Sequence, residues 1–204
     1  MINHSGGAEG SDTEWELIGE KYGVITKAYS FEGHKTQSKN RVILTLDELE
    51  KAAQHLVKAN KKLKRCFPPQ SRYIKALLLR NYYQVKNSEL ILAIGYFDMT
   101  VDDIKDGIDK LKPFNLKGGT AWAVQMAIDM RKGIHIFDST LNNWYYYNYA
   151  TNMYDKYLGT PNIAVENFAG IGTRDITPLG IKAISNVYER TFNREKFWEA
   201  KENE

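Results

Sequence analysis

The stretch MINHSGGAEGSD at residues 1–12 contains the pattern on which the fold depends. A short run that suits a strand, Met1–Ser5, leads into a glycine-rich turn at Gly6–Gly10. Apolar residues then recur at helical spacing over Asp12–Tyr22, and Gly23 is a stop signal. A strand, a glycine turn and a helix in this order form the unit from which parallel α/β sheets are built.

The rest of the chain repeats this alternation of apolar runs and helical patterns. The run LILAIG at Leu90–Gly95 is continuous and apolar, which is typical of a strand covered on both faces. Thr45 and Glu48 form a capping-box pattern, which predicts a helix to about Lys64. The alternation predicts an α/β fold with a mainly parallel sheet and helices on both faces. Further strands are expected at Val24–Ser30, Ile134–Asp138 and Ala164–Ile171, further helices at Ser71–Tyr82, Ala121–Arg131 and Thr177–Phe192, a loop at Phe31–Arg41 and a short helical insert at Asp98–Lys112.

The composition fits a single globular domain. The chain has 204 residues, of which 43% are hydrophobic and 26% charged. We expect one domain over residues 1–193, with an aromatic excursion at about 142–160, and a charged tail at 194–204. No apolar run approaches the roughly 20 residues that cross a bilayer, so no membrane contact is expected. The start of the chain lacks a signal-peptide pattern and Cys66 is its one cysteine, so a cytoplasmic location is expected.

Charge and metal-binding residues exclude some functions. The net charge of +3 is too small to predict nucleic-acid binding by itself. The basic stretch Lys58–Arg65 is either a solvated helix end or a surface that attracts phosphate. The four histidines are scattered and no cysteine cluster exists, so neither a metal nor another cofactor is expected.

Three glycine turns carry the chemical signal. They are Ser5–Asp12 (SGGAEGSD), Lys117–Thr120 (KGGT) and Gly170–Asp175 (GIGTRD). Glycine lets the backbone approach a ligand closely, and the helix that follows presents free N–H groups and a partial positive charge. Ligands of open α/β sheets bind outside the carboxyl ends of the strands, so we expect the three turns to converge there around an anion or a nucleotide. Each turn alone is equally well explained by tight packing.

The same segments resemble the SLOG superfamily, which includes the Rossmann-like domain of DNA-processing protein A, the LOG phosphoribohydrolases and the YspA/YpsA-type proteins. Residues 5–12 resemble its S-G-G-A-x-G-A-D signature, and residues 168–178 (FAGIGTRDITP) resemble its G-I-G-S-R-x-T-P segment. Arg80-Asn81 before the LILAIG run and Gly118-Gly119-Thr120 match two further family segments. The usual order of the first two segments is reversed here, so the resemblance implies a circularly permuted Rossmann-like fold. In that fold the strand at Ile2–Ser5 lies beside the strand at Ala164–Ile171.

The resemblance implies a binding protein for a nucleotide-derived small molecule, such as a cyclic nucleotide or an ADP-ribose-type signal. Stand-alone relatives occur in phages, where sequestering or sensing such a signal would counter host defence. The implied ligand-binding residues are Ser5, Gly6, Gly7, Gly10, Asp12, Arg80, Asn81, Gly118, Gly119, Thr120, Trp122, Gly172, Thr173 and Arg174.

Two alternatives to binding remain at this point. The first is a nucleotide hydrolase of the phosphoribohydrolase type. Its G-G-x-G-T-x-x-E glutamate falls on Ala123, so no catalytic residue is assigned unless Asp12 or Glu16 substitutes. The second, weaker alternative is binding of single-stranded DNA, against which the modest charge counts.

A homo-oligomer is also expected from the resemblance. The aromatic stretch NWYYYNY at Asn143–Tyr149 either packs in the core or forms a subunit contact, and stacking on a base is the other use of such rings. Trp122 lies shortly after the glycine pair, and this location favours stacking of its ring on a base.

Overall fold

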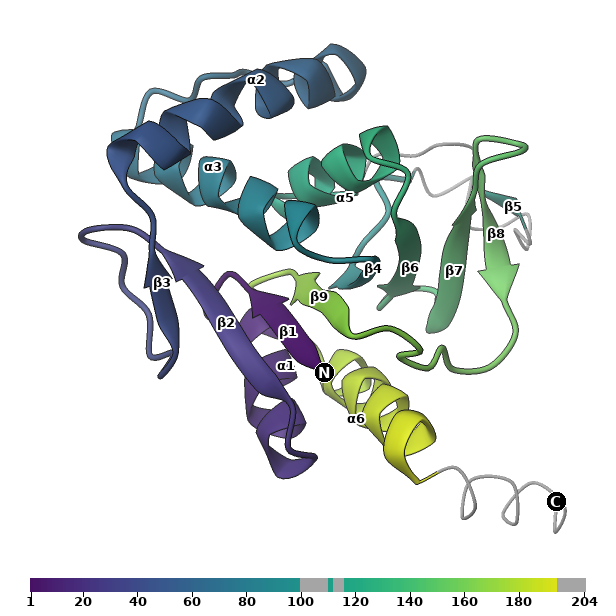
Figure 1. The fold of residues 1–204 in the computed structure, drawn as a ribbon. Coiled ribbons are helices and arrows are strands. Elements are labelled where there is room, and N and C mark those ends of the chain that lie inside the picture. The colour runs from purple at the N-terminus through teal and green to yellow at the C-terminus, as the bar shows by residue number, and fades with distance from the viewer. Residues whose placement is uncertain (100–109, 112–115, 194–204) are drawn as a thin grey trace, which may run out of the picture.

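The computed structural model describes residues 1–99, 110–111 and 116–193, and these residues form a layered α/β fold (Figure 1). Its sheet has the strand order β3-β2-β1-β9-β4-β6-β7-β8-β5. The six strands from β3 to β6 are parallel to their neighbours, and the last three pair in antiparallel fashion. The prediction of a mainly parallel sheet is confirmed. The strands are β1 (Ile2–Ser5), β2 (Ile25–Ser30), β3 (Arg41–Ile43), β4 (Leu90–Gly95), β5 (Lys110–Leu111), β6 (Gly133–Asp138), β7 (Asn143–Asn148), β8 (Met153–Tyr157) and β9 (Asn167–Gly172).

Helices cover both faces of the sheet, as predicted (Figure 1). On one face, α1 (Ser11–Lys21) packs against α6 (Pro178–Phe192), and the rings of Trp15, Phe168 and Tyr188 form the centre of that core. On the other face, α2 (Leu46–Leu63), α3 (Arg72–Lys86) and α5 (Thr120–Asp129) pack together over a larger core. Residues 91–94 of β4 are fully buried because that strand is covered from both sides.

The helix starts follow from local capping chemistry. The Thr45 hydroxyl accepts the N–H of Glu48 at 3.2 Å, and the Glu48 carboxylate accepts the N–H of Thr45 at 2.8 Å, which confirms the capping box of α2. The Thr177 hydroxyl accepts the N–H of Gly180 at 3.2 Å, with Pro178 at the first helical position of α6.

Strands β1 and β9 lie side by side, as the permuted order predicts. Ile2 pairs with Asn167 and Asn3 with Phe168 in parallel register. The Asn3 side-chain oxygen also accepts the N–H of Gly170 at 2.9 Å. When β9 is counted as the first strand, the parallel part of the sheet has the doubly wound order 3-2-1-4-5 with β3 added at the edge. The strand order then reverses between β9 and β4.

Several boundaries differ from the prediction. β3 begins at Arg41, the last residue of the stretch expected to be a loop, and no strand was predicted there. Its three residues are all exposed at the sheet edge, so the sequence shows no alternation of apolar and polar residues. β9 begins at Asn167 and not at Ala164, because the first residues of β1 and β4 pair no further back than Asn167 and Phe168. The aromatic excursion is the β7–β8 hairpin, with Trp144, Tyr145 and Tyr154 buried within the chain.

Two predicted features lie wholly or largely outside the described residues. The helical insert at Asp98–Lys112 falls mostly on residues 100–109, and the charged tail falls on residues 194–204. Lys110–Leu111 at the end of the expected insert form β5. Within the described ranges, none of the helices combines the length and the apolar character that a membrane span requires.

Candidate functional site

The turns after β1 and β9 contact one another at the carboxyl end of the sheet. The Ser11 N–H donates to the Thr173 carbonyl at 3.0 Å, and the Ser11 hydroxyl donates to the same oxygen at 2.8 Å. Gly10 has a φ of 94°, and a Cβ there would lie 2.2 Å from the Arg174 carbonyl oxygen. Only glycine fits between these two turns, because its backbone conformation and the close approach both exclude a side chain.

The third glycine turn is linked to the same edge through Tyr96. The Lys117 N–H donates to the Tyr96 carbonyl at 2.9 Å, and the Tyr96 hydroxyl donates to the Asp175 carbonyl at 3.3 Å. The turns at Ser5–Asp12, Lys117–Thr120 and Gly170–Asp175 therefore follow one another along the carboxyl edge. The link through Tyr96 joins the ends of β4 and β9, between which the strand order reverses, and open α/β sheets bind ligands at such a reversal.

A buried ion pair crosses the end of β1. Arg80 on α3 reaches over Gly6, and its Nη2 lies 3.8 Å from the Asp12 Oδ2 on α1. Its Nη1 donates to Gln84 Oε1 at 2.8 Å and to Asn81 Oδ1 at 3.2 Å. A Cβ on Gly6 would lie 1.5 Å from this guanidinium nitrogen, so the glycine is needed for the arginine to pass.

The ion pair is neutral overall, and burial is the main cause of the pKa shifts of both partners. Burial raises the pKa of Asp12, while the positive charge of Arg80 opposes this shift. Burial likewise lowers the pKa of Arg80, and Asp12 opposes that shift. In this arrangement the charge of Arg80, one of the implied ligand-binding residues, faces Asp12, and the two side chains are 5% and 6% exposed.

The first glycine turn is covered by the loop between β2 and β3. The Ser5 hydroxyl accepts the N–H of Gly7 at 3.0 Å and donates to the carboxylate of Glu16. A Cβ at Gly7 would lie 2.6 Å from the Thr36 hydroxyl and 2.7 Å from the Ser38 hydroxyl. Burial raises the pKa of Glu16, and its hydrogen bonds to Ser5 and Ser38 act in the opposite direction. This turn is a closed polar cluster.

The turn before α5 is open by comparison. Gly118 and Gly119 are exposed, and no side chain caps the first N–H groups of α5. A Cβ at Gly118 would meet nothing within 4 Å, and one at Gly119 would touch only Leu78 at 4.0 Å. An uncapped helix N-terminus has unsatisfied N–H groups and a partial positive charge, so this is the part of the edge best suited to an anion.

Arg65 positions this open turn and was not predicted as a site residue. Its two terminal nitrogens donate to the carbonyl oxygens of Gly118 at 2.6 Å and Leu116 at 2.5 Å. The signal was present in the basic stretch Lys58–Arg65, but the sequence does not show which of its cations reaches residues more than fifty positions away. Thr36 and Ser38 were also not predicted, because nothing in their loop sequence relates them to Gly7.

The remaining predicted residues divide between the edge and the core. Thr173 lies in the β9 turn, and Arg174 is exposed there. Gly172 is a packing glycine, since a Cβ there would lie 2.4 Å from the Ile94 carbonyl oxygen. Trp122 is only 4% exposed and packs against Phe67 with ring centroids 5.3 Å apart, so its ring is not free to stack on a base.

Thr120, the last of the predicted residues, begins α5 and is 8% exposed. Across residues 1–99, 110–111 and 116–193, no three His, Cys, Asp or Glu side chains gather in a way that could hold a metal ion. Comparison of the chain with protein-family models, with curated proteins and with solved structures gave no match.

Proposed function

We propose that the protein binds a nucleotide-derived small molecule at the carboxyl edge of its parallel sheet, with an anionic group of the ligand at the open N-terminus of α5. The observation that carries this proposal is the chain of hydrogen bonds that links the three glycine turns, partly through Tyr96, near the reversal of strand order, with Gly118 and Gly119 exposed at one end. The resemblance to SLOG proteins supports the ligand class, of which cyclic nucleotides and ADP-ribose-type signals are members.

The charges at the edge favour this position for the anion. At the first turn, the Ser11 N–H already donates to Thr173, and the carboxylate of Asp12 lies beside Gly6. The charge of Arg80 at this turn is already neutralised by Asp12, so the turn offers a phosphate no net positive charge. At the α5 turn the N–H groups are uncapped, and Arg174 is exposed in the neighbouring β9 turn. An exposed arginine at this edge suits bidentate contact with a phosphate group of an extended ligand.

Binding without cleavage fits the residues better than catalysis. The position that corresponds to the hydrolase glutamate is Ala123, which is 2% exposed and part of the core. We therefore infer that the ligand is held and released intact, as sequestration or sensing of a signal requires.

A hydrolase remains the second candidate because of Asp12 and Glu16. These carboxyl groups lie one turn apart on α1, and burial raises the pKa of both. Carboxyl groups with raised pKa values at a ligand site suit general acid–base catalysis. Both are covered in this arrangement, so catalysis would require the loop over Gly7 to move.

The test is a panel of mono-, di- and cyclic nucleotides and NAD derivatives, with thermal shift to report binding and chromatography to report cleavage. We expect stabilisation by at least one compound and its recovery unchanged. Appearance of a product that is lost in Glu16→Gln would establish the hydrolase instead, and the absence of any thermal shift across the panel would contradict both candidates.

The position of the anion is tested by the pair Gly119→Asp and Gly119→Asn. Both side chains have similar shape and fit beside Leu78, but only aspartate brings a negative charge to the N-terminus of α5. We expect Gly119→Asp to weaken binding by about tenfold or more relative to Gly119→Asn. The aspartate carboxylate would repel the anionic group of the ligand and compete with it for the N–H groups at the start of α5. Equal affinities of the two variants would place the anion elsewhere.

A further inference from the structure

A cleft lies along α5, between the end of α2 and the β7–β8 hairpin. Its volume is about 510 Å³, which is in the range typical of small-molecule sites. Its lining begins at Leu116 and Ala121, next to the Gly118–Thr120 turn, and runs along α5 to Asp129. By the rise of a helix, Asp129 lies about 13 Å from Thr120, so this end of the cleft is separate from the proposed nucleotide site.

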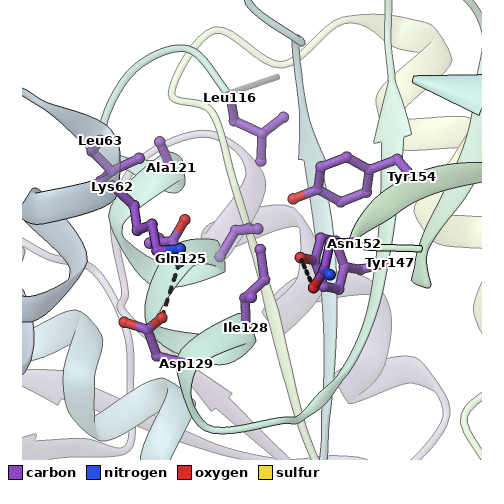
Figure 2. Close-up of a pocket in the computed structure, with 11 residues that line it drawn as sticks. Lys62, Leu63, Leu116, Ala121, Gln125, Ile128, Asp129, Tyr147, Asn152 and Tyr154 are labelled. Atoms are coloured by element: carbon purple, nitrogen blue, oxygen red, sulfur yellow. Dashed lines mark hydrogen bonds between the residues drawn. The ribbon is translucent and has the colours of Figure 1, made fainter. Parts of the chain in front are cut away.

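Figure 2 shows two walls of different character. The helix wall is a stripe of α5 side chains at helical spacing, in which the apolar Ala121, Val124 and Ile128 alternate with two polar residues. Those polar residues, Gln125 and Asp129, are joined by a hydrogen bond of 3.1 Å.

The hairpin wall is aromatic. Tyr147 and Tyr154 are 9% and 3% exposed, and the hydroxyl of Tyr154 points toward the helix wall (Figure 2). The Tyr147 hydroxyl donates to Asn152 Oδ1 at 3.4 Å. Burial raises the pKa of Tyr147, and the negative charge of Asp129 raises it further, so the carboxylate acts electrostatically on this wall.

Asp129 is the unusual residue of the cleft. Its Oδ1 accepts from Gln125, but its Oδ2 is buried and has no hydrogen-bond partner among the described residues. Asp129 is also the last residue of α5, where the helix dipole disfavours a negative charge. The unpartnered oxygen and the negative charge at the end of the helix both lower stability. Their presence at a cleft is accounted for if a bound ligand brings a positive charge to the carboxylate.

We propose that this cleft binds a flat organic cation, which lies between the tyrosine wall and the apolar stripe of α5 and is attracted by the charge of the Asp129 carboxylate. Attraction to the carboxylate favours the positive charge, and the apolar stripe of α5 favours the flat apolar body of such a ligand. Lys62, exposed at the rim, repels it and so has the opposite effect on affinity from Asp129. The proposal does not depend on the nucleotide site.

The experiment uses benzamidine, a flat aromatic cation, and benzamide, its uncharged counterpart of nearly the same shape. Binding to the full chain is measured by titration calorimetry and thermal shift. We expect benzamidine to bind and stabilise the protein, and benzamide to do so about tenfold less well or worse.

Two variants test the sign of the charge. Asp129→Asn keeps the shape and is expected to fold at least as stably as the wild type, since it removes a negative charge from the end of α5, but to weaken benzamidine binding by about tenfold or more. Lys62→Met is expected to bind benzamidine at least as tightly as the wild type. No binding of benzamidine, equal binding of benzamide, or loss of binding in Lys62→Met but not in Asp129→Asn would each overturn the proposal.

Discussion

At the scale of single residues, the Asp12–Arg80 pair ties the two helical layers together across the end of β1. Asp12 lies on α1 and Arg80 lies on α3, and these helices cover opposite faces of the sheet. Gly6 lies between the two side chains and leaves room for the guanidinium. A buried pair of this kind contributes little as a pair, but removing one partner is costly because the other charge is left buried. Its role is to fix how the first glycine turn sits between α1 and α3.

Arg80→Met is therefore expected to lower the free energy of unfolding by about 3 kcal/mol or more at neutral pH. The double variant Asp12→Asn with Arg80→Met should lose less than the sum of the single variants, since neither charge then remains buried. Urea unfolding followed by circular dichroism measures both. Arg174→Met, at an exposed arginine of the same edge, is the control and should change stability by no more than about 0.5 kcal/mol. Additive effects of the two substitutions would show that the pair is not coupled.

At the scale of elements, the loop between β2 and β3 is anchored by His34. Its Nδ1 is hydrogen bonded to the Ser30 hydroxyl at 3.0 Å, and its ring stacks on Phe31. Burial, together with the positive charges of Arg80 and Arg41, lowers the pKa of His34 to about 4. Thr36 and Ser38 of the same loop lie over Gly7.

The lowered pKa of His34 predicts that the folded protein is less stable in acid. Between pH 6.5 and about 4, the unfolded chain takes up a proton on His34 that the folded protein excludes, so stability falls as the pH falls through that window. The contribution is about 2–3 kcal/mol. His135, whose pKa burial also lowers to about 4, acts in the same direction. Urea unfolding near pH 7 and near pH 4.5 should show a smaller difference for His34→Gln than for the wild type, and an equal difference would contradict the assignment.

The elements differ in how far local sequence determines them. The capping box of α2 and the apolar run of β4 depend on neighbouring residues, and both were predicted correctly at the start of α2 and over Leu90–Gly95. β3 depends on pairing with β2, so its exposed residues gave no local signal.

The candidate site shows the same division between local and long-range determinants. The glycine turns are local patterns and were predicted. The approach of Arg65 to Gly118, of Ser38 to Gly7 and of Arg80 to Asp12 depends on contacts between residues that are distant in the sequence, which pattern and composition do not specify.

At the scale of the whole molecule, the sheet separates two cores and leaves one edge exposed. In the aromatic stretch Asn143–Tyr149, for which core packing and a subunit contact were the alternatives, Trp144, Tyr145 and Tyr147 are buried within the chain, while Tyr146 and Tyr149 are half-buried. Val42 and Ile43 at the β3 edge are 38% and 54% exposed. A homo-oligomer remains a prediction, and an exposed edge strand of this kind is where a second chain would pair.

Hydrogen exchange measured by mass spectrometry should reflect this arrangement. We expect the slowest exchange in β4, which is paired on both sides and covered on both faces, and the fastest exchange among the strands in β3. Fast exchange of β3 at low concentration with protection at high concentration would indicate pairing with another copy. Protection of β3 equal to that of β4 at every concentration would contradict an exposed edge.

Tyr96 has a consequence for communication within the molecule. Its backbone holds Lys117 and its phenol holds Asp175, so one residue spans the boundary between strands β4 and β9. A ligand that displaced one of these loops would also displace the other through the two hydrogen bonds of Tyr96. Ligand binding at one loop would then also shift the other, and Tyr96→Phe, which removes the hydroxyl, should weaken this coupling.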